Sequence, residues 1–333
     1  MRLGRTILNS TAALLSLLGR QGPRAVAALI VIGIALPPVG AWFKPFVTEA
    51  VFVLLCIAFL RLDGTAFRSY LKHPAIVLVA TAWTSLAIPA SLGAIYLALG
   101  LKERSPDLFL ALTLQAVAPP LMAAPALAAL VGLDATLVLC TMVTSTALLP
   151  LTAPLFAYVF VGPALSLSPL TIGLKLVALL TGSALVAFAL RRIAGLSAIA
   201  RQRERIDGFN ILVMFVFVSA MMETVGARFL ATPMITIGLA ALAFIVAFVL
   251  LGATMLVLAA TGRERALTLG FTTSQRNTGL MLAATASALP DLGWLYFAFT
   301  YLPLYLLPLL LQPLARRIIP KTRSSATART PTT

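Results

Sequence analysis

An arginine stands at the centre of a polar segment that apolar residues enclose on both sides. Residues 272–279 read Thr-Thr-Ser-Gln-Arg-Asn-Thr-Gly. A guanidinium group stays protonated at physiological pH, and its planar fork of donors matches the two oxygens of a carboxylate. A charge in apolar surroundings is costly unless it faces protein partners or a water-filled cavity. The segment therefore predicts a binding site for an anion, with Arg276 as its principal group and Gln275 and Asn277 beside it.

A cluster of prolines marks a second unusual segment. Residues 118–125 read Ala-Pro-Pro-Leu-Met-Ala-Ala-Pro, and the prolines are Pro119, Pro120 and Pro125. In a helix interior each proline removes a backbone donor and clashes with the preceding turn, at a cost of roughly 3 kcal/mol. We therefore expect one broken helix here and another between Thr272 and Gly279. Their freed backbone groups must find partners inside the protein, so the two breaks are expected to cross near the membrane midplane.

Other polar side chains occur close to these two segments. Gln115 lies shortly before the first proline, and Thr144 and Ser145 fall in the next apolar run. All three are candidate substrate-binding residues. Hydroxyl groups bind ligands but also hold helices together, and both interpretations of Thr144 and Ser145 stay open. Glu49 and Glu223, near the ends of their runs, are candidate proton carriers within the membrane. They could equally be ordinary interfacial residues.

The composition indicates that these segments belong to an all-α integral membrane protein. Hydrophobic residues make up 60% of the chain and charged residues 11%, and the mean hydropathy is +1.02. Such values lie far outside the range of soluble domains. A hydrocarbon core of about 30 Å needs about 20 helical residues, and several apolar runs reach that length. The runs lack the alternation of a lipid-facing strand, which favours helices over a barrel.

Clusters of proline, glycine and charge divide the apolar sequence into ten predicted spans. These are residues 24–43, 45–62, 74–99, 106–130, 133–160, 168–190, 207–223, 232–260, 264–288 and 291–315. Residues 1–23 are expected to form a cytoplasmic interfacial helix and residues 317–333 a disordered cytoplasmic tail. The spans between them form two five-helix blocks, residues 24–160 and 161–316. Because each block has an odd number of spans, the second block is inverted relative to the first.

The basic residues give the orientation of the spans. The net charge is +15. With the N-terminus in the cytoplasm, nineteen Lys and Arg residues fall on the cytoplasmic side and four on the other side. This asymmetry follows the positive-inside rule and predicts a multi-pass protein of the cell (inner) membrane with both termini cytoplasmic. The same placement beside apolar runs accounts for the charge without a nucleic-acid partner.

The residues needed for enzymatic or metal chemistry are sparse. The chain has one histidine, His73, and its cysteines, Cys56 and Cys140, each lie inside an apolar run. No zinc-protease, serine-hydrolase or Cys/His motif is present. We therefore predict that the chain is not an enzyme and has no cofactor, metal site or disulfide.

The sequence resembles the bile acid:sodium symporter family, part of the bile/arsenite/riboflavin transporter superfamily, as a divergent member. The resemblance rests on the proline-rich break, the Gly-Leu-Asp-Ala-Thr-Leu of residues 132–137, Thr144-Ser145-Thr146 with Pro150, and residues 276–280, Arg-Asn-Thr-Gly-Leu. It implies ten helices in two inverted repeats, arranged as a panel domain and a core domain with two broken helices crossing in the core. It also implies a substrate site between the domains, beside the crossing, and transport by alternating access.

The chain departs from the sodium-coupled members of that family at the expected ion ligands. Those members carry an acidic residue four positions before a glutamine that precedes Asn-Ser/Thr-Gly, and Thr272 and Arg276 take these two places here. Ala124 and Pro125 stand where those members have a Ser-Asn pair. Thr84 stands near the place of the glutamine that those members carry in the third span. Sodium coupling therefore does not carry over from the resemblance.

These observations predict a secondary active transporter of a small organic anion in a lipid bilayer. Arg276 is expected to replace a bound cation and to hold the substrate. Alternatively, Arg276 pairs permanently with Glu49 or Glu223 and only locks the core. The coupling ion, Na⁺ or H⁺, stays open, as do two other functions: a sodium-coupled symporter of bile-acid type, and a passive channel or efflux permease.

The predicted topology places Ser105 outside the cell and Ser197 in the cytoplasm. Cysteines introduced at these positions should differ in labelling by a membrane-impermeant maleimide. The first should react in intact cells and the second only after permeabilisation, with the unmodified chain giving the background of the native cysteines. Reversed accessibility at either position would contradict the topology.

Overall fold

The computed structural model describes residues 13–18, 20, 32–33, 36–62, 74–162, 168–285 and 288–318. Over these residues the protein is helical and contains no strand. The all-α class is confirmed. Most of the predicted interfacial helix, half of the predicted first span and the predicted tail from residue 319 lie outside the described residues. Residues 13–18 of the predicted interfacial helix are helical.

The helices follow one another through short connections. In chain order they are α2 (Pro37–Phe43), η1 (Lys44–Phe46), α3 (Val47–Leu60), α5 (Pro74–Ala82), η2 (Trp83–Ala87), α6 (Ile88–Ala98), α7 (Leu101–Arg104), α8 (Pro106–Val117), α9 (Ala124–Val131), α10 (Ala135–Phe156), η3 (Ala157–Val161), α11 (Pro169–Ala194), α12 (Leu196–Arg201), α13 (Arg203–Met222), α14 (Val225–Ala231), α15 (Pro233–Val257), η5 (Ala259–Thr261), α16 (Arg263–Ser274), α17 (Thr278–Thr285) and α18 (Asp291–Ile318).

Seven helical runs in the described ranges are long and apolar enough to cross a membrane. They are Pro37–Leu60, Pro74–Ala98, Ala135–Val161, Pro169–Ala194, Arg203–Ala231, Pro233–Val257 and Asp291–Ile318. Pro37–Leu60 overlaps the predicted spans 24–43 and 45–62, and each of the other six runs overlaps one predicted span. The predicted spans 106–130 and 264–288 are each divided into two shorter helices, α8 with α9 and α16 with α17. The structure therefore shows a multi-pass helical membrane protein. The ten spans and the two inverted repeats stay a prediction.

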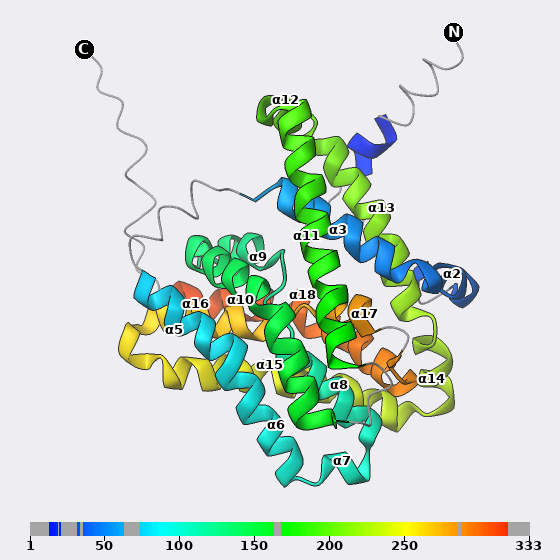
Figure 1. Cartoon of the computed structure of the whole chain (residues 1–333), viewed down its shortest axis with the longest axis vertical. Coiled ribbons are helices and arrows are strands. Elements are labelled where there is room, and N and C mark those ends of the chain that lie inside the picture. The colour runs from blue at the N-terminus through cyan, green and yellow to red at the C-terminus, as the bar shows by residue number, and fades with distance from the viewer. Residues whose placement is uncertain are drawn as a thin grey trace.

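The helices form two groups in space (Figure 1). The small group contains α2, α3, α11 and α13, which pack along one another. The large group contains α5, α6, α8 to α10 and α15 to α18. The groups meet where α11 packs against α10, where α3 packs against α17, and where α13 packs against α18. The small group therefore contacts the broken span 264–288 through α17, which packs against α3 and α11.

Local sequence explains where several helices begin. A proline occupies the first turn of α8, α11 and α15, where its missing N–H costs no helical hydrogen bond. Asp134 caps α10 by accepting hydrogen bonds from the backbone N–H groups of Thr136 and Leu137, both at 3.0 Å. Ser168 caps α11 in the same way through the N–H of Thr171 at 3.1 Å. These caps satisfy donors that would otherwise be left free at a helix start.

The helices differ in how much of their apolar surface is exposed. On α11, α14 and α15 large apolar side chains are exposed, among them Leu174, Leu230 and Met234. Such surfaces suit hydrocarbon rather than water as the solvent. The described residues of α17 are all buried, and so are those of α16 from Ala266 onward. Residues 266–285 of the broken span are thus enclosed by protein.

Gly270 lets α16 approach α15 closely. A Cβ atom at this position would lie 2.8 Å from the Leu251 carbonyl oxygen and 3.0 Å from Cγ of Met255. Small residues allow such close helix contacts in membranes. A backbone oxygen cannot yield without moving α15 itself, so this contact fixes α16 and the residues that follow it.

Replacing Gly270 by alanine should lower the free energy of unfolding by about 1–3 kcal/mol, because the added methyl overpacks the contact. The matched control is Gly252→Ala on α15, where a Cβ atom would meet nothing within 4 Å. That control should be neutral or slightly stabilising, since alanine favours a helix over glycine by about 1 kcal/mol. Unfolding in mixed micelles, followed by circular dichroism, measures both. Equal stability of the two variants would contradict the assigned contact.

Candidate functional site

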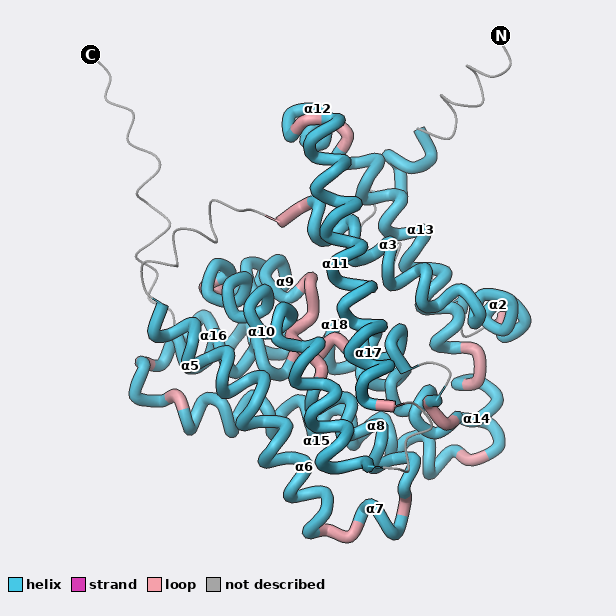
Figure 2. Tube along the Cα trace, in the orientation of Figure 1, coloured by secondary structure: helices cyan, strands magenta, loops and turns pink. Residues whose placement is uncertain are grey.

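The two helix breaks cross and hydrogen-bond to each other. The N–H of Leu121 donates to the carbonyl of Gln275 at 2.7 Å, and the N–H of Asn277 donates to the carbonyl of Pro119 at 2.8 Å. Pro120 and Arg276 therefore face each other in an isolated antiparallel bridge. Figure 2 shows short loop segments in the middle of the helical assembly. The backbone groups freed at one break are satisfied by those freed at the other.

The breaks are narrower than the sequence predicted. The first comprises residues 118–123 and the second residues 275–277. Pro125 is helical because it occupies the first turn of α9, a position that needs no N–H donor. Thr272 is helical in α16, and its hydroxyl donates to the carbonyl of Thr268 at 2.7 Å. Gly279 is helical in α17, so Pro125, Thr272 and Gly279 flank the breaks and do not form them.

Arg276 lies at the centre of the crossing with only 3% of its surface exposed. Its Nη1 donates to the carbonyl of Ala118 at 2.7 Å and to the carbonyl of Thr84 at 3.3 Å. Its Nε and Nη2 are buried and have no hydrogen-bond partner among the described residues. One edge of the guanidinium is therefore engaged with the protein, and the donors of another edge remain available.

The two carbonyls that Arg276 binds are free because of prolines. At the π-helical turn η2, the N–H of Ile88 donates to the carbonyl of Trp83, five residues back. The carbonyl of Thr84 would next pair with residue 89, but Pro89 has no N–H. The carbonyl of Ala118 is free because α8 ends before Pro119. Arg276 thus supplies donors that the helices themselves have lost.

No carboxylate among the described residues forms an ion pair with Arg276. Glu223 forms an ion pair with Lys44 at 2.8 Å. Glu49 is exposed at the start of α3 and forms no ion pair with another described residue. A permanent pair of Arg276 with Glu49 or Glu223, the alternative drawn from the sequence, is therefore not formed in this structure.

The remaining predicted residues divide into two sets. Asn277 accepts a hydrogen bond from the N–H of Leu280 at 3.1 Å and so caps α17. Thr144 bonds the Thr81 hydroxyl at 2.5 Å and the Cys140 carbonyl at 2.8 Å, which joins α10 to α5. These two side chains are engaged in holding helices.

The second set contains Gln275, Ser145 and Gln115. Gln275 and Ser145 are buried, and neither has a side-chain partner among the described residues. Gln115 is also buried, and its Oε1 accepts a hydrogen bond from the Tyr296 hydroxyl at 2.5 Å. Tyr296 was not predicted, because the apolar sequence around it gives no sign of a polar partner in α8.

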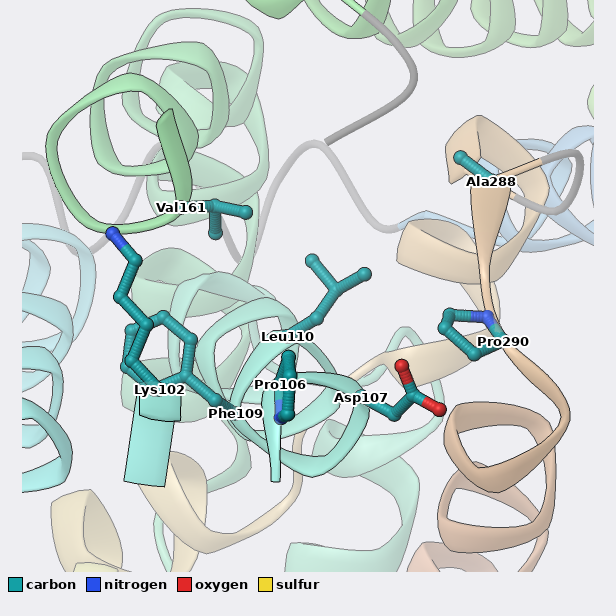
Figure 3. Close-up of a pocket in the computed structure, with 8 residues that line it drawn as sticks. All are labelled: Lys102, Pro106, Asp107, Phe109, Leu110, Val161, Ala288 and Pro290. Atoms are coloured by element: carbon teal, nitrogen blue, oxygen red, sulfur yellow. The ribbon is translucent and has the colours of Figure 1, made fainter. Parts of the chain in front are cut away.

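Two pockets of the structure lie away from the crossing. One, of about 270 Å³, is lined by residues near α7 and the start of α8, and Figure 3 shows Lys102 and Asp107 on opposite sides of it. Lys102 donates to the Phe160 carbonyl at 2.9 Å. The other, of about 350 Å³, lies between α3, α11 and α17. Neither pocket is lined by Arg276 or by any other predicted substrate-binding residue. Gln275, Arg276 and Asn277 are all buried, so the crossing is closed in this conformation.

Comparisons with known proteins leave the family unassigned. No family model matches the chain, and no curated protein matches it. The resemblance to bile acid:sodium symporters therefore stays a prediction, and the geometry of the crossing carries the functional interpretation.

Replacing Tyr296 by phenylalanine tests the link between α18 and α8. Loss of the hydroxyl leaves the buried Oε1 of Gln115 without its donor, which should lower the free energy of unfolding by about 1–3 kcal/mol. Tyr305→Phe on the same helix is the control, because its hydroxyl meets only the sulfur of Met214, at 3.9 Å. The control should change stability by less than about 0.5 kcal/mol. Similar losses in both variants would show that the Gln115 bond contributes little.

Proposed function

We propose that the chain is a secondary active transporter of a small organic anion, and that Arg276 is the cation of its substrate site. The observation that carries this proposal is a pair of buried donors on one guanidinium, Nε and Nη2, which have neither a hydrogen-bond partner nor a neighbouring carboxylate among the described residues. A substrate carboxylate or sulfonate accepts two parallel hydrogen bonds from such an edge. An unneutralised charge in the interior is costly, so the site favours an anionic occupant.

The crossing supports a transporter because broken helices at membrane depth are tolerated only where protein or a cavity satisfies them. Paired interruptions of this kind form the binding sites of many inverted-repeat transporters. α17 starts directly after Asn277 and touches α3 of the small group, so a movement between the two groups is transmitted to the crossing. On this proposal, alternating access is a displacement of one group against the other.

Sodium independence follows from the same geometry. The carbonyls of Thr84 and Ala118, which are the kind of oxygens that coordinate a cation, are occupied by Nη1 of Arg276. A fixed positive charge also repels Na⁺ at close range. Arg276 stays protonated, so it cannot carry a coupling proton. If protons are coupled, Glu49 or Glu223 is the carrier, and for Glu223 this requires release of its ion pair with Lys44.

The proposal places the chain in the cell membrane with both termini in the cytoplasm. The basic residues support this orientation. Arg61 pairs with Asp207 at one end of the small group, and Lys44 pairs with Glu223 at the other end. The first end carries the arginines at the end of α11, in α12 and at the start of α13, which the positive-inside rule assigns to the cytoplasm.

Transport in proteoliposomes tests the function. Wild-type protein should accumulate labelled carboxylates or sulfonates from a panel without a sodium gradient, and counterflow should accelerate uptake, as it does not for a channel. Arg276→Lys keeps the charge but loses the bidentate geometry, so the apparent affinity should fall about tenfold, and Arg276→Gln should lose more. Arg192→Gln, at the exposed end of α11, is the matched control and should be unchanged.

Circular dichroism and gel filtration show whether each variant is folded, and Arg276→Lys keeps the test valid if Arg276→Gln does not fold. Unchanged affinity in a folded Arg276→Gln protein would contradict the assigned role of the guanidinium. Strictly sodium-dependent transport by the wild type would contradict the built-in cation.

A further inference from the structure

A second positive charge lies inside a membrane-spanning helix. Lys175 is in α11, within a run that is long and apolar enough to cross a membrane. Its side chain is half-buried and forms no hydrogen bond or ion pair with another described residue. On the same helix Leu174 is 61% exposed, whereas Leu176 is fully buried. Lys175 therefore lies at the margin between the outer face of α11 and the contact with its neighbours.

Lys175 lines the pocket of about 350 Å³ between the small group and α17. The other lining residues are Thr48 and Phe52 of α3, Ala178 and Leu179 of α11, and Ala283 of α17. The lining is thus mainly apolar, with one ammonium group and one hydroxyl. The Thr48 hydroxyl donates to the carbonyl of Ala283 at 3.3 Å, which joins α3 to α17 beside the pocket. Small-molecule sites commonly have this size and this combination of an apolar wall with few polar groups.

We propose that this pocket is a binding subsite for an amphipathic organic anion. The carboxylate or sulfonate of the ligand pairs with Nζ of Lys175, and its apolar part packs against Phe52 and Leu179. An ammonium group in a low-dielectric region needs a negative partner, and the described residues offer none at this position. The walls come from both helix groups, so a bound ligand bridges them.

The inference rests on the proposed function, because the ligand is the transported anion, bound at Lys175 before it reaches the site at Arg276. Ala283, which lines the pocket, follows Arg276 by seven residues, and this corresponds to a rise of about 10 Å along α17 at 1.5 Å per residue. The pocket at Lys175 is open, whereas the crossing around Arg276 is closed. An anion attracted to Lys175 is therefore held at the junction of the groups before the crossing becomes accessible.

A purely structural role for Lys175 makes a different prediction. Lysine stems extend along apolar surfaces to place the ammonium among lipid headgroups, and Lys175 lies in the second turn of α11. In that case Nζ would have no part in binding a soluble anion. Anionic lipid would then be the partner of Lys175.

Equilibrium binding of 1-naphthoate to the purified full-length chain separates these outcomes. The protein is held in nanodiscs of phosphatidylcholine, and binding is measured by equilibrium dialysis without any ion gradient. Lys175→Gln should weaken binding at least about tenfold, because it removes a charge-assisted hydrogen bond. Lys175→Arg should bind within a few-fold of wild type, and 1-naphthalenemethanol, which lacks the charge, should not compete. Arg192→Gln on the same helix is the matched control and should bind as wild type.

Equal affinity in wild type and Lys175→Gln would overturn the subsite, and so would the absence of saturable binding to wild type. Displacement of naphthoate by phosphatidylglycerol in the nanodiscs, dependent on Lys175, would assign the site to lipid and also overturn it. The failure of the proposed function is separate. Naphthoate binding that depends on Lys175, in a protein that transports no anion, would retain the subsite and reject the transporter.

Discussion

The structure depends on one requirement: backbone groups freed at a helix break inside an apolar environment must find partners. Proline removes donors at Pro119 and Pro120, and the chain cannot restore them locally. At the crossing, backbone groups of two distant segments pair with each other instead: Leu121 donates to Gln275 and Asn277 donates to Pro119. Arg276 completes the set by donating to two further carbonyls that prolines left free. Enclosure of α16 and α17, the close contact at Gly270 and the cap at Asn277 all serve to hold this arrangement.

The same arrangement gives one side chain two kinds of interaction. Nη1 of Arg276 is a structural donor that ties η2 to the end of α8. Nε and Nη2 are not required for that purpose. A lysine offers a compact point charge, and so cannot satisfy both carbonyls and present a flat pair of donors to a ligand at the same time. The planar guanidinium therefore suits a position where structure and binding meet.

The sequence was sufficient for the features that depend on local covalent constraints. A proline cluster breaks a helix wherever the chain places it, and a polar segment in an apolar run must be enclosed, so both breaks could be predicted. Their exact limits could not, because Pro125 and Gly279 are compatible with helix starts as well as with breaks. The carbonyl of Thr84 lies 192 residues from Arg276 in the chain, and only the packing brings the two together. A threonine such as Thr144 is compatible with ligand binding and with helix packing, and its hydrogen bond to Thr81 is a packing contact. The pocket beside Lys175 could not be predicted, because packing alone brings α3 and α17 next to α11.

A cation that is part of the chain cannot dissociate, and this has an electrical consequence for the crossing at Arg276. A loaded site, with one anion on one guanidinium, is close to neutral, whereas an empty site carries a full positive charge. Moving one elementary charge through the membrane potential involves about 2.3 kcal/mol per 100 mV, while moving a neutral complex involves almost none. Under the proposed function, the membrane voltage therefore acts on the return of the empty carrier and not on the step that carries the substrate. Such a carrier favours exchange of one anion for another over net movement in one direction.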